Sequence, residues 1–194
     1  MKKFISLLLI LILSLSLFSC KANGPIKFTI EIADGRSMSG ELYPDIAPKT
    51  VENFVKLCNE DFYKDLVFHR VIEGFMIQGG GYSGGIYEGD FTEKPANTIH
   101  GEFMTNGFEN TLSHERGVIS MARLGNDPNS GSSQFFIMHE DNPSLDGNYA
   151  AFGKITEGLH LIDEIATCEK IALNPLFTDV PKDAIVIKTI RIEE

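Results

Sequence analysis

Basic side chains are scarce in this sequence. Its 194 residues include 17 lysines and arginines against 27 aspartates and glutamates, which gives a formal net charge of −10 at pH 7. A chain with this excess of negative charge repels nucleic-acid phosphates and anionic lipid head groups. We therefore expect it neither to bind nucleic acid nor to attach to a membrane through a basic surface.

Cysteine and metal-binding patterns are also sparse. The three cysteines, Cys20, Cys58 and Cys168, are too few for the disulfide framework of a small secreted domain. Cys58 falls on one face of a predicted helix, as a small buried hydrophobe would, and a bridge between Cys58 and Cys168 stays open. The five histidines show no HExxH spacing and no cysteine pair joins them, so we predict no metal site.

Long apolar runs are missing except at the N-terminus. Lys2 and Lys3 precede a 15-residue run from Phe4 to Phe18, broken only by serines, which is typical of a secretory signal. A membrane-spanning helix needs about 20 apolar residues, so an uncleaved anchor is the second interpretation. The run ends in LFSC, which resembles the lipobox of bacterial lipoproteins, with Cys20 as the lipidated first residue of the mature chain. An ordinary signal that ends at a free cysteine is the alternative.

The predicted organisation follows from this N-terminus. We predict a signal peptide at 1–19, lipidation at Cys20, a tether at 20–25 and one domain at 26–194. Removing 1–19 leaves 15 basic and 27 acidic side chains, a net charge of −12. We expect an exported protein anchored by lipid to a bacterial cell membrane, on its periplasmic or outer face.

Short strands dominate the mature chain. IKFTIEI at 26–32 alternates apolar and polar residues, and Asp34-Gly35 sits where a hairpin turn to SMSGELY belongs. Helical spacing and an early Pro48 predict a helix over 48–59, and a second helix fits 158–166 with Leu159, Ile162, Ile165 and Ala166 on one face. The remaining strands are LVFHRVI, FMIQGG, GVISMA, QFFIM, YAAFGKI and AIVIKTIRI. This order predicts a mainly β fold, a closed antiparallel barrel with helices over its openings.

Two catalytic patterns overlap in the glycine-rich stretch QGGGYSGG. Gly79, Gly81 and Gly84 fit GxGxxG, and Ser83 is the centre of GxSxG. Both motifs need a helix directly after the glycines, and the residues that follow, IYEGDFTEKPAN, predict none. We interpret the glycines as a flexible loop that bends beside a site. A serine hydrolase that uses Ser83 is a remote alternative.

The segments FHRVIEGFMIQGG, GVISMAR, SGSSQFFI and LDGNYAAFGK resemble, in order and separation, the signature segments of the cyclophilin family of peptidyl-prolyl cis-trans isomerases. The likeness runs from about residue 26 to the C-terminus. It implies a closed eight-stranded antiparallel β-barrel capped by two α-helices. It also implies an enzyme that accelerates rotation about X-Pro bonds in polypeptide clients and assists protein folding, without a cofactor. We expect a monomer.

The same resemblance implies the site residues. Arg70 stands at the catalytic arginine, and the backbone at Arg123 matches one that hydrogen-bonds the substrate peptide. The proline pocket would be lined by Phe75, Met76, Phe136 and Leu145, and the groove beside it by Gln78, Ala122 and Gln134. Two positions depart from the family: Ser144 replaces a frequent tryptophan, and Tyr149 replaces a frequent histidine of the pocket wall. The chain has no tryptophan at all. A cyclophilin-fold module that only holds proline-containing segments is the chief alternative function.

Overall fold

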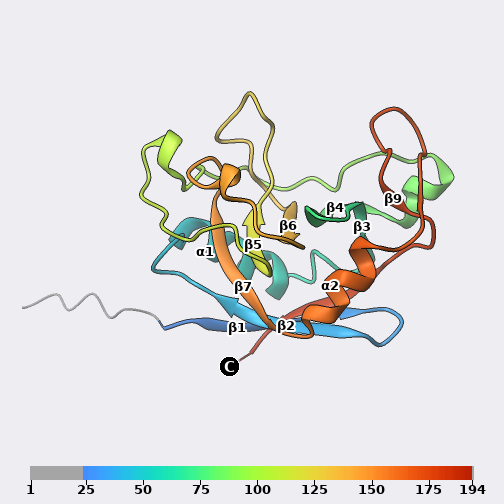
Figure 1. The fold of residues 1–194 in the computed structure, drawn as a ribbon, viewed down its shortest axis with the longest axis horizontal. Coiled ribbons are helices and arrows are strands. Elements are labelled where there is room, and N and C mark those ends of the chain that lie inside the picture. The colour runs from blue at the N-terminus through green and yellow to red at the C-terminus, as the bar shows by residue number, and fades with distance from the viewer. Residues whose placement is uncertain (1–23, 194) are drawn as a thin grey trace, which may run out of the picture.

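Eight antiparallel strands form one sheet that curls into a barrel (Figure 1). The computed structural model describes residues 24–193, so the predicted signal peptide and Cys20 lie outside the described residues. The strands are β1 (Ile26–Ile32), β2 (Ser37–Leu42), β3 (Leu66–Ile72), β4 (Met76–Ser83), β5 (Val118–Met121), β6 (Phe135–Met138), β7 (Ala151–Glu157) and β10 (Ile187–Ile192). Their order in the sheet is β10-β1-β2-β7-β5-β6-β4-β3.

The two ends of this sheet approach each other and nearly close the barrel. The amide of Phe68 on β3 donates to the carbonyl of Ile185 at 3.1 Å, and Val67 forms an isolated bridge with Val186 just before β10. Closure removes the open edges through which sheets aggregate. The predicted mainly β, eight-stranded antiparallel barrel is therefore confirmed.

Two helices cover the barrel, α1 (Pro48–Asn59) and α2 (Leu159–Ala166). Phe54 of α1 enters the barrel core, where its ring lies 5.9 Å from Phe28, 5.6 Å from Phe135 and 5.1 Å from Phe152. Edge-to-face and tilted packing of this kind suits the charge distribution of aromatic rings. No helix between residues 24 and 193 is long and apolar enough to cross a bilayer.

The N-terminus of α1 is held by a side chain that is distant in the sequence. Its cap residue Ala47 offers no side-chain acceptor. Instead, the buried carboxylate of Glu102 accepts the amides of Lys49 at 2.9 Å and Thr50 at 2.8 Å, together with the Thr50 hydroxyl at 2.7 Å. The first amides of a helix lack partners within it, and negative charge is favourable at this end.

Three details differ from the sequence prediction. The predicted strand FMIQGG continues through Gly81 to Ser83 as β4, where a flexible loop was expected, and a short 3-10 helix, η1 (Gly84–Glu88), follows where no helix was predicted. It has only five residues and ends at Gly89, whose φ is +90°. In α2 the buried residues include Leu161, which the predicted face omitted, whereas Leu159 is only partly buried.

Short elements without a sequence period complete the fold. They are η2 (Met104–Asn106), η3 (Pro143–Leu145), β8 (Lys170–Ile171) and β9 (Val180–Pro181). The strands β8 and β9 pair antiparallel outside the barrel and carry the loop 172–179 between them. Cys58 is buried, as predicted, and both Cys58 and Cys168 are free thiols. The loops before and after these elements surround the candidate site.

Candidate active site

Strand register builds one face of the site. Arg70 of β3 pairs with Gln78 of β4, which pairs with Phe136 of β6, which in turn pairs with Ser120 of β5. Residues directly opposite each other in antiparallel strands point to the same side of the sheet. Phe135 belongs to the barrel core and Phe136 to a second apolar cluster. The site therefore lies on the outer face of the barrel.

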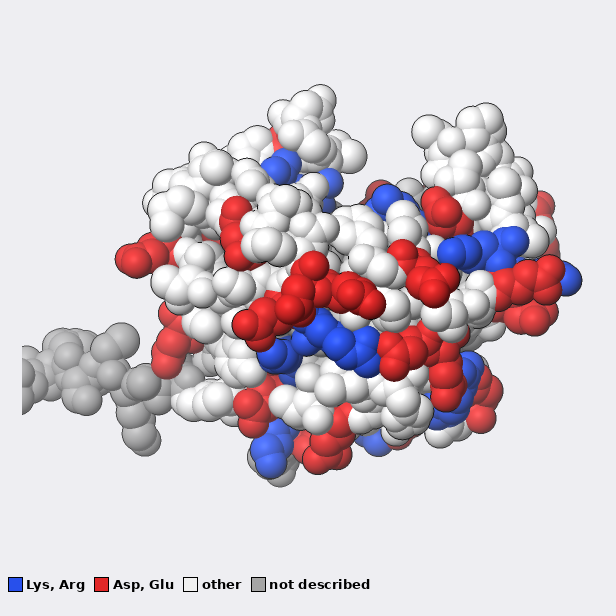
Figure 2. Space-filling model, viewed as in Figure 1, with Lys and Arg blue, Asp and Glu red and all other residues white. Residues whose placement is uncertain are grey.

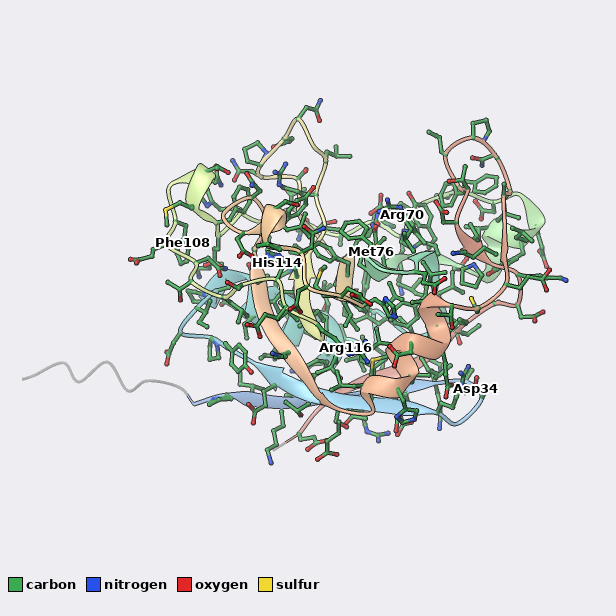
Figure 3. All side chains as sticks on the ribbon, viewed as in Figure 1. Asp34, Arg70, Met76, Phe108, His114 and Arg116 are labelled. Carbon is green, nitrogen blue, oxygen red and sulfur yellow. The ribbon has the colours of Figure 1, made fainter. Side chains whose placement is uncertain are left out.

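A cavity of about 120 Å³ opens on this face. Figure 3 labels Arg70 and Met76, which lie on its strands. The cavity is lined by Arg70, Phe75, Met76, Gln78, Ala122, Arg123, Phe136, Leu145 and Tyr149. These are nine of the ten catalytic and substrate-binding residues that the resemblance named. Strands β3, β4 and β6, the segment after β5 and the loop after η3 each supply part of the wall.

The tenth residue, Gln134, lies in a larger neighbouring cavity. This hollow, of about 730 Å³, shares Arg70, Gln78, Ala122 and Arg123 with the smaller one. Figure 2 shows it between two raised segments, the loop after β5 and the loop 172–179. An extended polypeptide could therefore occupy both cavities at once.

A chain of amide groups stands behind the guanidinium of Arg70. Its Nη1 donates to Oε1 of Gln78 at 3.4 Å, which is long for a hydrogen bond. Gln78 donates to Gln134 at 2.9 Å, and Gln134 donates to the carboxylate of Glu93 at 2.8 Å. Arg70 itself is exposed. Its remaining donors can therefore reach a bound peptide.

The glycine run makes room for this chain. A Cβ on Gly81 would lie only 2.6 Å from Cγ of Gln134, and one on Gly80, whose φ is +86°, would lie 2.8 Å from the carbonyl of Ser133. Ser83 has no histidine partner in the structure; its hydroxyl accepts the amide of Gly85 at 3.2 Å. The glycines thus serve the site by lacking side chains.

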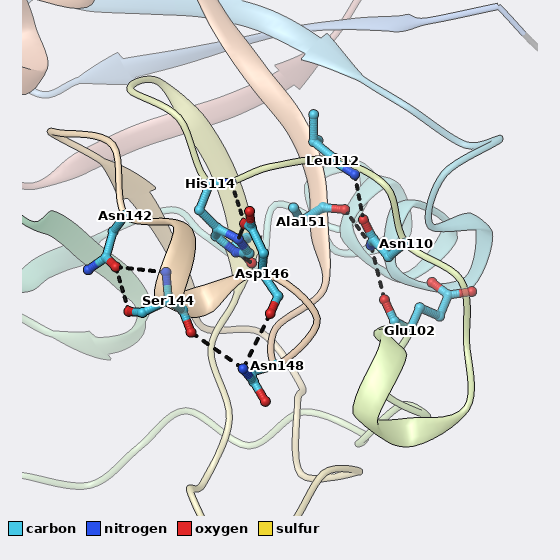
Figure 4. Close-up of polar contacts among 10 residues, drawn as sticks. Glu102, Asn110, Leu112, His114, Asn142, Ser144, Asp146, Asn148 and Ala151 are labelled. Carbon is cyan, nitrogen blue, oxygen red and sulfur yellow. Dashed lines mark hydrogen bonds and ion pairs between the residues drawn. The ribbon is translucent and has the colours of Figure 1, made fainter.

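The buried side chain of His114 connects the segment that carries Leu145 to strand β5 (Figure 4). Nδ1 of His114 lies 2.8 Å from Asp146, next to Leu145, and Nε2 lies 2.9 Å from the Ser120 hydroxyl. The His114 ring also stacks on Phe136 with centroids 6.0 Å apart. No sequence motif around His114 indicates this acid partner, because 32 residues separate it from Asp146.

Ser120, His114 and Asp146 are hydrogen-bonded in the same sequence as the residues of a catalytic Ser-His-Asp triad, but their role is different. Ser120 is 0% exposed, so no substrate can reach its hydroxyl. Burial lowers the pKa of His114, although the hydrogen bond to Asp146 acts in the opposite direction. A carboxylate only accepts hydrogen bonds, so the neutral ring keeps its proton on Nδ1 and accepts one from Ser120 at Nε2. The sequence carried no local signal for this arrangement.

No group of three or more His, Cys, Asp or Glu side chains that could hold a metal ion occurs in the described part of the chain.

A family model described as "Cyclophilin type peptidyl-prolyl cis-trans isomerase/CLD" matches residues 27–192. The chain belongs to the cyclophilin family of peptidyl-prolyl cis-trans isomerases. The match spans essentially the whole described domain of this cyclophilin.

Individual relatives agree. The chain is 49% identical over 128 residues to peptidyl-prolyl cis-trans isomerase B of Bacillus subtilis, covering 66% of this chain and 82% of that protein. It is 36% identical over 160 residues to peptidyl-prolyl cis-trans isomerase B of Escherichia coli, covering 78% and 91%. A Cryptosporidium parvum cyclophilin-type isomerase superposes with a TM-score of 0.72 at 30% identity, covering 88% of this chain and 98% of that one, and was also solved in the presence of the dipeptide Ala-Pro.

One of the two departures from the family, Tyr149, lines the small cavity, and the other, Ser144, is next to the lining residue Leu145. Ser144 is exposed, and its hydroxyl donates to Asn142 at 2.5 Å (Figure 4). Tyr149 lines the cavity, with its ring edge-on to Phe136 at 5.6 Å and the Arg123 guanidinium 4.7 Å from its centroid. Tyr149 therefore keeps an aromatic wall, whereas Ser144 leaves the rim of this cyclophilin lower than a tryptophan would.

A second buried histidine, His69, should make the stability of this cyclophilin depend on pH. Burial lowers the pKa of His69 from 6.5 to about 4, and its Nδ1 has no partner among the described residues. The unfolded chain therefore binds more protons than the folded one between these values. The contribution of His69 to stability is complete above pH 6.5 and is lost as the pH falls toward 4.

We expect His69 to account for a loss on the order of 2–3 kcal/mol in unfolding free energy between pH 7 and pH 4.5. Urea unfolding of the wild type and of His69→Phe at several pH values in this range measures it. Other titrating groups act equally in both proteins, so the difference between the two curves isolates His69. Parallel curves would contradict the prediction.

Proposed function

We propose that Arg70 catalyses the isomerisation by stabilising the twisted X-Pro bond, and that the clients are exported proteins met at a membrane. One observation supports the catalytic part most directly. The guanidinium of Arg70 is exposed at a cavity with apolar walls, whereas the guanidinium of Arg123, which also lines the cavity, is already bonded to main-chain carbonyls. The apolar side chains are those of Phe75, Met76, Phe136 and Leu145.

The chemistry needs no covalent step. Rotation about a peptide bond has a barrier of about 18–20 kcal/mol because resonance gives the C–N bond partial double-bond character. In the twisted state the proline nitrogen becomes pyramidal and regains a lone pair. A guanidinium can then donate a hydrogen bond to that nitrogen, which accepts none while resonance persists. Arg70 would therefore bind the transition state more strongly than the ground state, which is the condition for raising the rate.

The apolar walls hold the proline ring, and the neighbouring polar groups hold the rest of the peptide. Met76 is 1% exposed and Phe136 is 5% exposed, so their surfaces can exclude water from a proline ring. Ala122, beside Arg123, has its amide already paired with Gln134 at 2.9 Å. The backbone N–H and C=O of Arg123 make no hydrogen bond to another residue of the described chain. They remain open to the backbone of a client, which would keep one side of the rotating bond still.

The proposed location follows from the N-terminal sequence. The signal-like run and Cys20 precede a barrel whose first strand begins at Ile26. The residues 20–25 can span at most about 20 Å when extended, at 3.3–3.6 Å per residue. A lipid on Cys20 would therefore hold the barrel close to the bilayer, where newly translocated polypeptides emerge. Figure 2 shows acidic and basic side chains intermixed on the visible face, with no continuous basic surface.

Replacing Cys20 with serine should abolish membrane attachment, because serine lacks the thiol that carries the lipid. The full-length wild type, expressed in a bacterium and labelled with a radioactive fatty acid, should incorporate label and sediment with membranes. Cys20→Ser should do neither. Cys168→Ser provides the control because it removes a thiol elsewhere and should behave as the wild type. Membrane sedimentation of an unlabelled Cys20→Ser protein would contradict the lipid anchor.

A peptide-holding module with weak turnover is the second candidate function. The exposed Ser144, in place of a tryptophan at the rim, favours it, because a lower wall restrains the segment beside the rotating bond less firmly and so lowers turnover more than it lowers binding along the rest of the groove. Isomerisation of a short Ala-Pro-Phe-type peptide by residues 21–194 distinguishes the two. Turnover far above the spontaneous rate supports the enzyme, whereas binding without turnover supports the module.

A further inference from the structure

A chain of polar contacts lies behind the pocket wall and connects it to α2. The guanidinium of Arg116, labelled in Figure 3, forms two hydrogen bonds with the carboxylate of Asp163 on α2, at 2.6 and 3.0 Å. The same carboxylate lies 3.2 Å from Nε2 of His139, which directly follows β6. On the other side of the ring, Nδ1 of His139 lies 2.9 Å from the amide nitrogen of Gly74. His139 is only 7% exposed.

This geometry assigns one protonation state to His139. A backbone N–H can only donate, so Nδ1 must present its lone pair to Gly74 and carry no proton. Nε2 then carries the ring proton and donates it to the carboxylate of Asp163. Asp163 is kept anionic by Arg116, whose hydrogen bonds are the main cause that lowers its pKa. The negative charge of Asp163 on α2 therefore favours the neutral tautomer of His139 in which Nε2 carries the proton.

The group held by Nδ1 belongs to the turn that carries Phe75. Gly74 has a φ of +74°, in the left-handed region, and directly precedes Phe75. The backbone of His139 also donates to the carbonyl of Phe75 at 2.9 Å. His139 thus holds both the amide before Phe75 and the carbonyl of Phe75 itself. The Phe75 ring lines the small cavity beside Met76.

We propose that His139 is a positioning residue for the isomerase, which fixes the turn between β3 and β4 so that Phe75 closes the proline pocket. Nδ1 of His139 accepts the hydrogen bond from the Gly74 amide in this turn. Asp163 accepts the ring proton at Nε2, so that Nδ1 stays unprotonated. His139 lines neither of the two cavities. The proposal rests on the active site proposed above and adds the residue that holds one of its walls.

Two substitutions separate the two ring nitrogens. The side-chain oxygen of asparagine is bonded to Cγ, as Nδ1 is, so His139→Asn can still accept from Gly74. The amide of glutamine reaches the position of Nε2, so His139→Gln keeps a donor to Asp163 and leaves Gly74 without an acceptor. Both variants remove the ring. A general loss of packing therefore affects them alike.

The test measures kcat and KM on a proline tetrapeptide, the thermal midpoint, and the ¹H–¹⁵N shift of the Gly74 amide. We expect His139→Asn to keep kcat/KM within about threefold of the wild type, and His139→Gln to lose about tenfold, mainly through a higher KM. The Gly74 signal should move upfield in His139→Gln only. Equal kinetics in the two variants, or a Gly74 signal that stays unchanged in His139→Gln, would overturn the proposal.

This outcome is distinct from a failure of the active-site proposal. If the wild type had no turnover, the Gly74 shift and the affinity for a proline peptide would still report on the turn. If Arg70→Ala kept full activity while the two His139 variants differed as expected, the positioning role of His139 would be supported and the catalytic role of Arg70 would be contradicted.

Discussion

Replacing Arg70 with alanine should lower kcat/KM for a proline peptide by about 100-fold or more while the fold stays intact. The estimate follows from enzymes in which removal of one transition-state hydrogen-bond donor costs about 10²–10³ in rate. Arg70 is exposed and makes one long contact, to Gln78 at 3.4 Å. Its removal therefore leaves no buried group without a partner, so stability should change by less than about 0.5 kcal/mol.

Two further variants sharpen this experiment. Arg70→Lys keeps the charge but replaces the rigid planar donor with a compact, strongly hydrated ammonium, and we expect it to lose about tenfold, or 1.4 kcal/mol of transition-state binding. Arg191→Ala removes an exposed guanidinium that pairs with Glu31 on the barrel surface, so its activity should equal that of the wild type. A protease-coupled assay gives all three rates. Wild-type turnover in correctly folded Arg70→Ala would contradict the assigned role.

Replacing Glu102 with alanine should produce the largest loss of stability. Glu102 is 2% exposed and accepts two amides at the start of α1 and the Thr50 hydroxyl. Each buried donor left without an acceptor costs about 1–3 kcal/mol. We expect the unfolding free energy to fall by about 3–5 kcal/mol. Glu102→Gln, which keeps one acceptor oxygen but turns an NH₂ group toward these donors, should lose an intermediate amount.

Urea unfolding at neutral pH measures these losses, with Glu109→Ala as the matched control. Glu109 is an exposed carboxylate on the same segment, so its replacement should change stability by less than about 0.5 kcal/mol. The main-chain carbonyl of Glu102, which both substitutions leave in place, accepts from Asn110, which also donates to Ala151 of β7 (Figure 4). Equal stability of Glu102→Ala and Glu109→Ala would contradict the role of Glu102 in holding the helix.

Elements with a clear hydrophobic period were predictable from the sequence alone. The strands at Ile26–Ile32 and Leu66–Ile72 and the helix at Pro48–Asn59 have the predicted bounds. The strand Ile26–Ile32 buries alternate side chains and the helix buries helically spaced ones, whereas Leu66–Ile72 is a short apolar run that is buried at five of its seven positions. The strands β8 and β9 have two residues each. A two-residue strand has no period, so periodicity could not find them.

The site also has a part that was predictable from the sequence and a part that was not. The resemblance named the residues of the cavity, because they lie in contiguous motifs on β3, β4 and β6, directly after β5 and around η3, and the fold brings these motifs together. The residues that support the cavity were not predictable. His114 meets Asp146 across 32 residues, and the Gly74 amide meets His139 across 65. A hydrogen bond between groups this far apart in the chain leaves no pattern in one sequence.

The glycine-rich stretch shows how a local pattern misleads. GxGxxG and GxSxG describe loops that lead into α-helices, yet here Gly84 and Gly85 begin the short 3-10 helix η1, and Gly79 to Gly81 continue strand β4. Their positions are explained by close neighbours, Gln134 over Gly81 and the Ser133 carbonyl near Gly80. Only the folded arrangement reveals those neighbours.

The central claim is that the face of Arg70, Phe75, Met76 and Gln78 turns over X-Pro bonds rather than merely holding them. The most direct measurement is magnetisation exchange between the cis and trans NMR signals of a proline tetrapeptide, with residues 21–194 present at about one-hundredth of the peptide concentration. Uncatalysed exchange takes tens to hundreds of seconds and gives no exchange peaks. We predict exchange peaks with the wild type and their loss with Arg70→Ala. Shifts that report binding without exchange in the wild type would contradict the account.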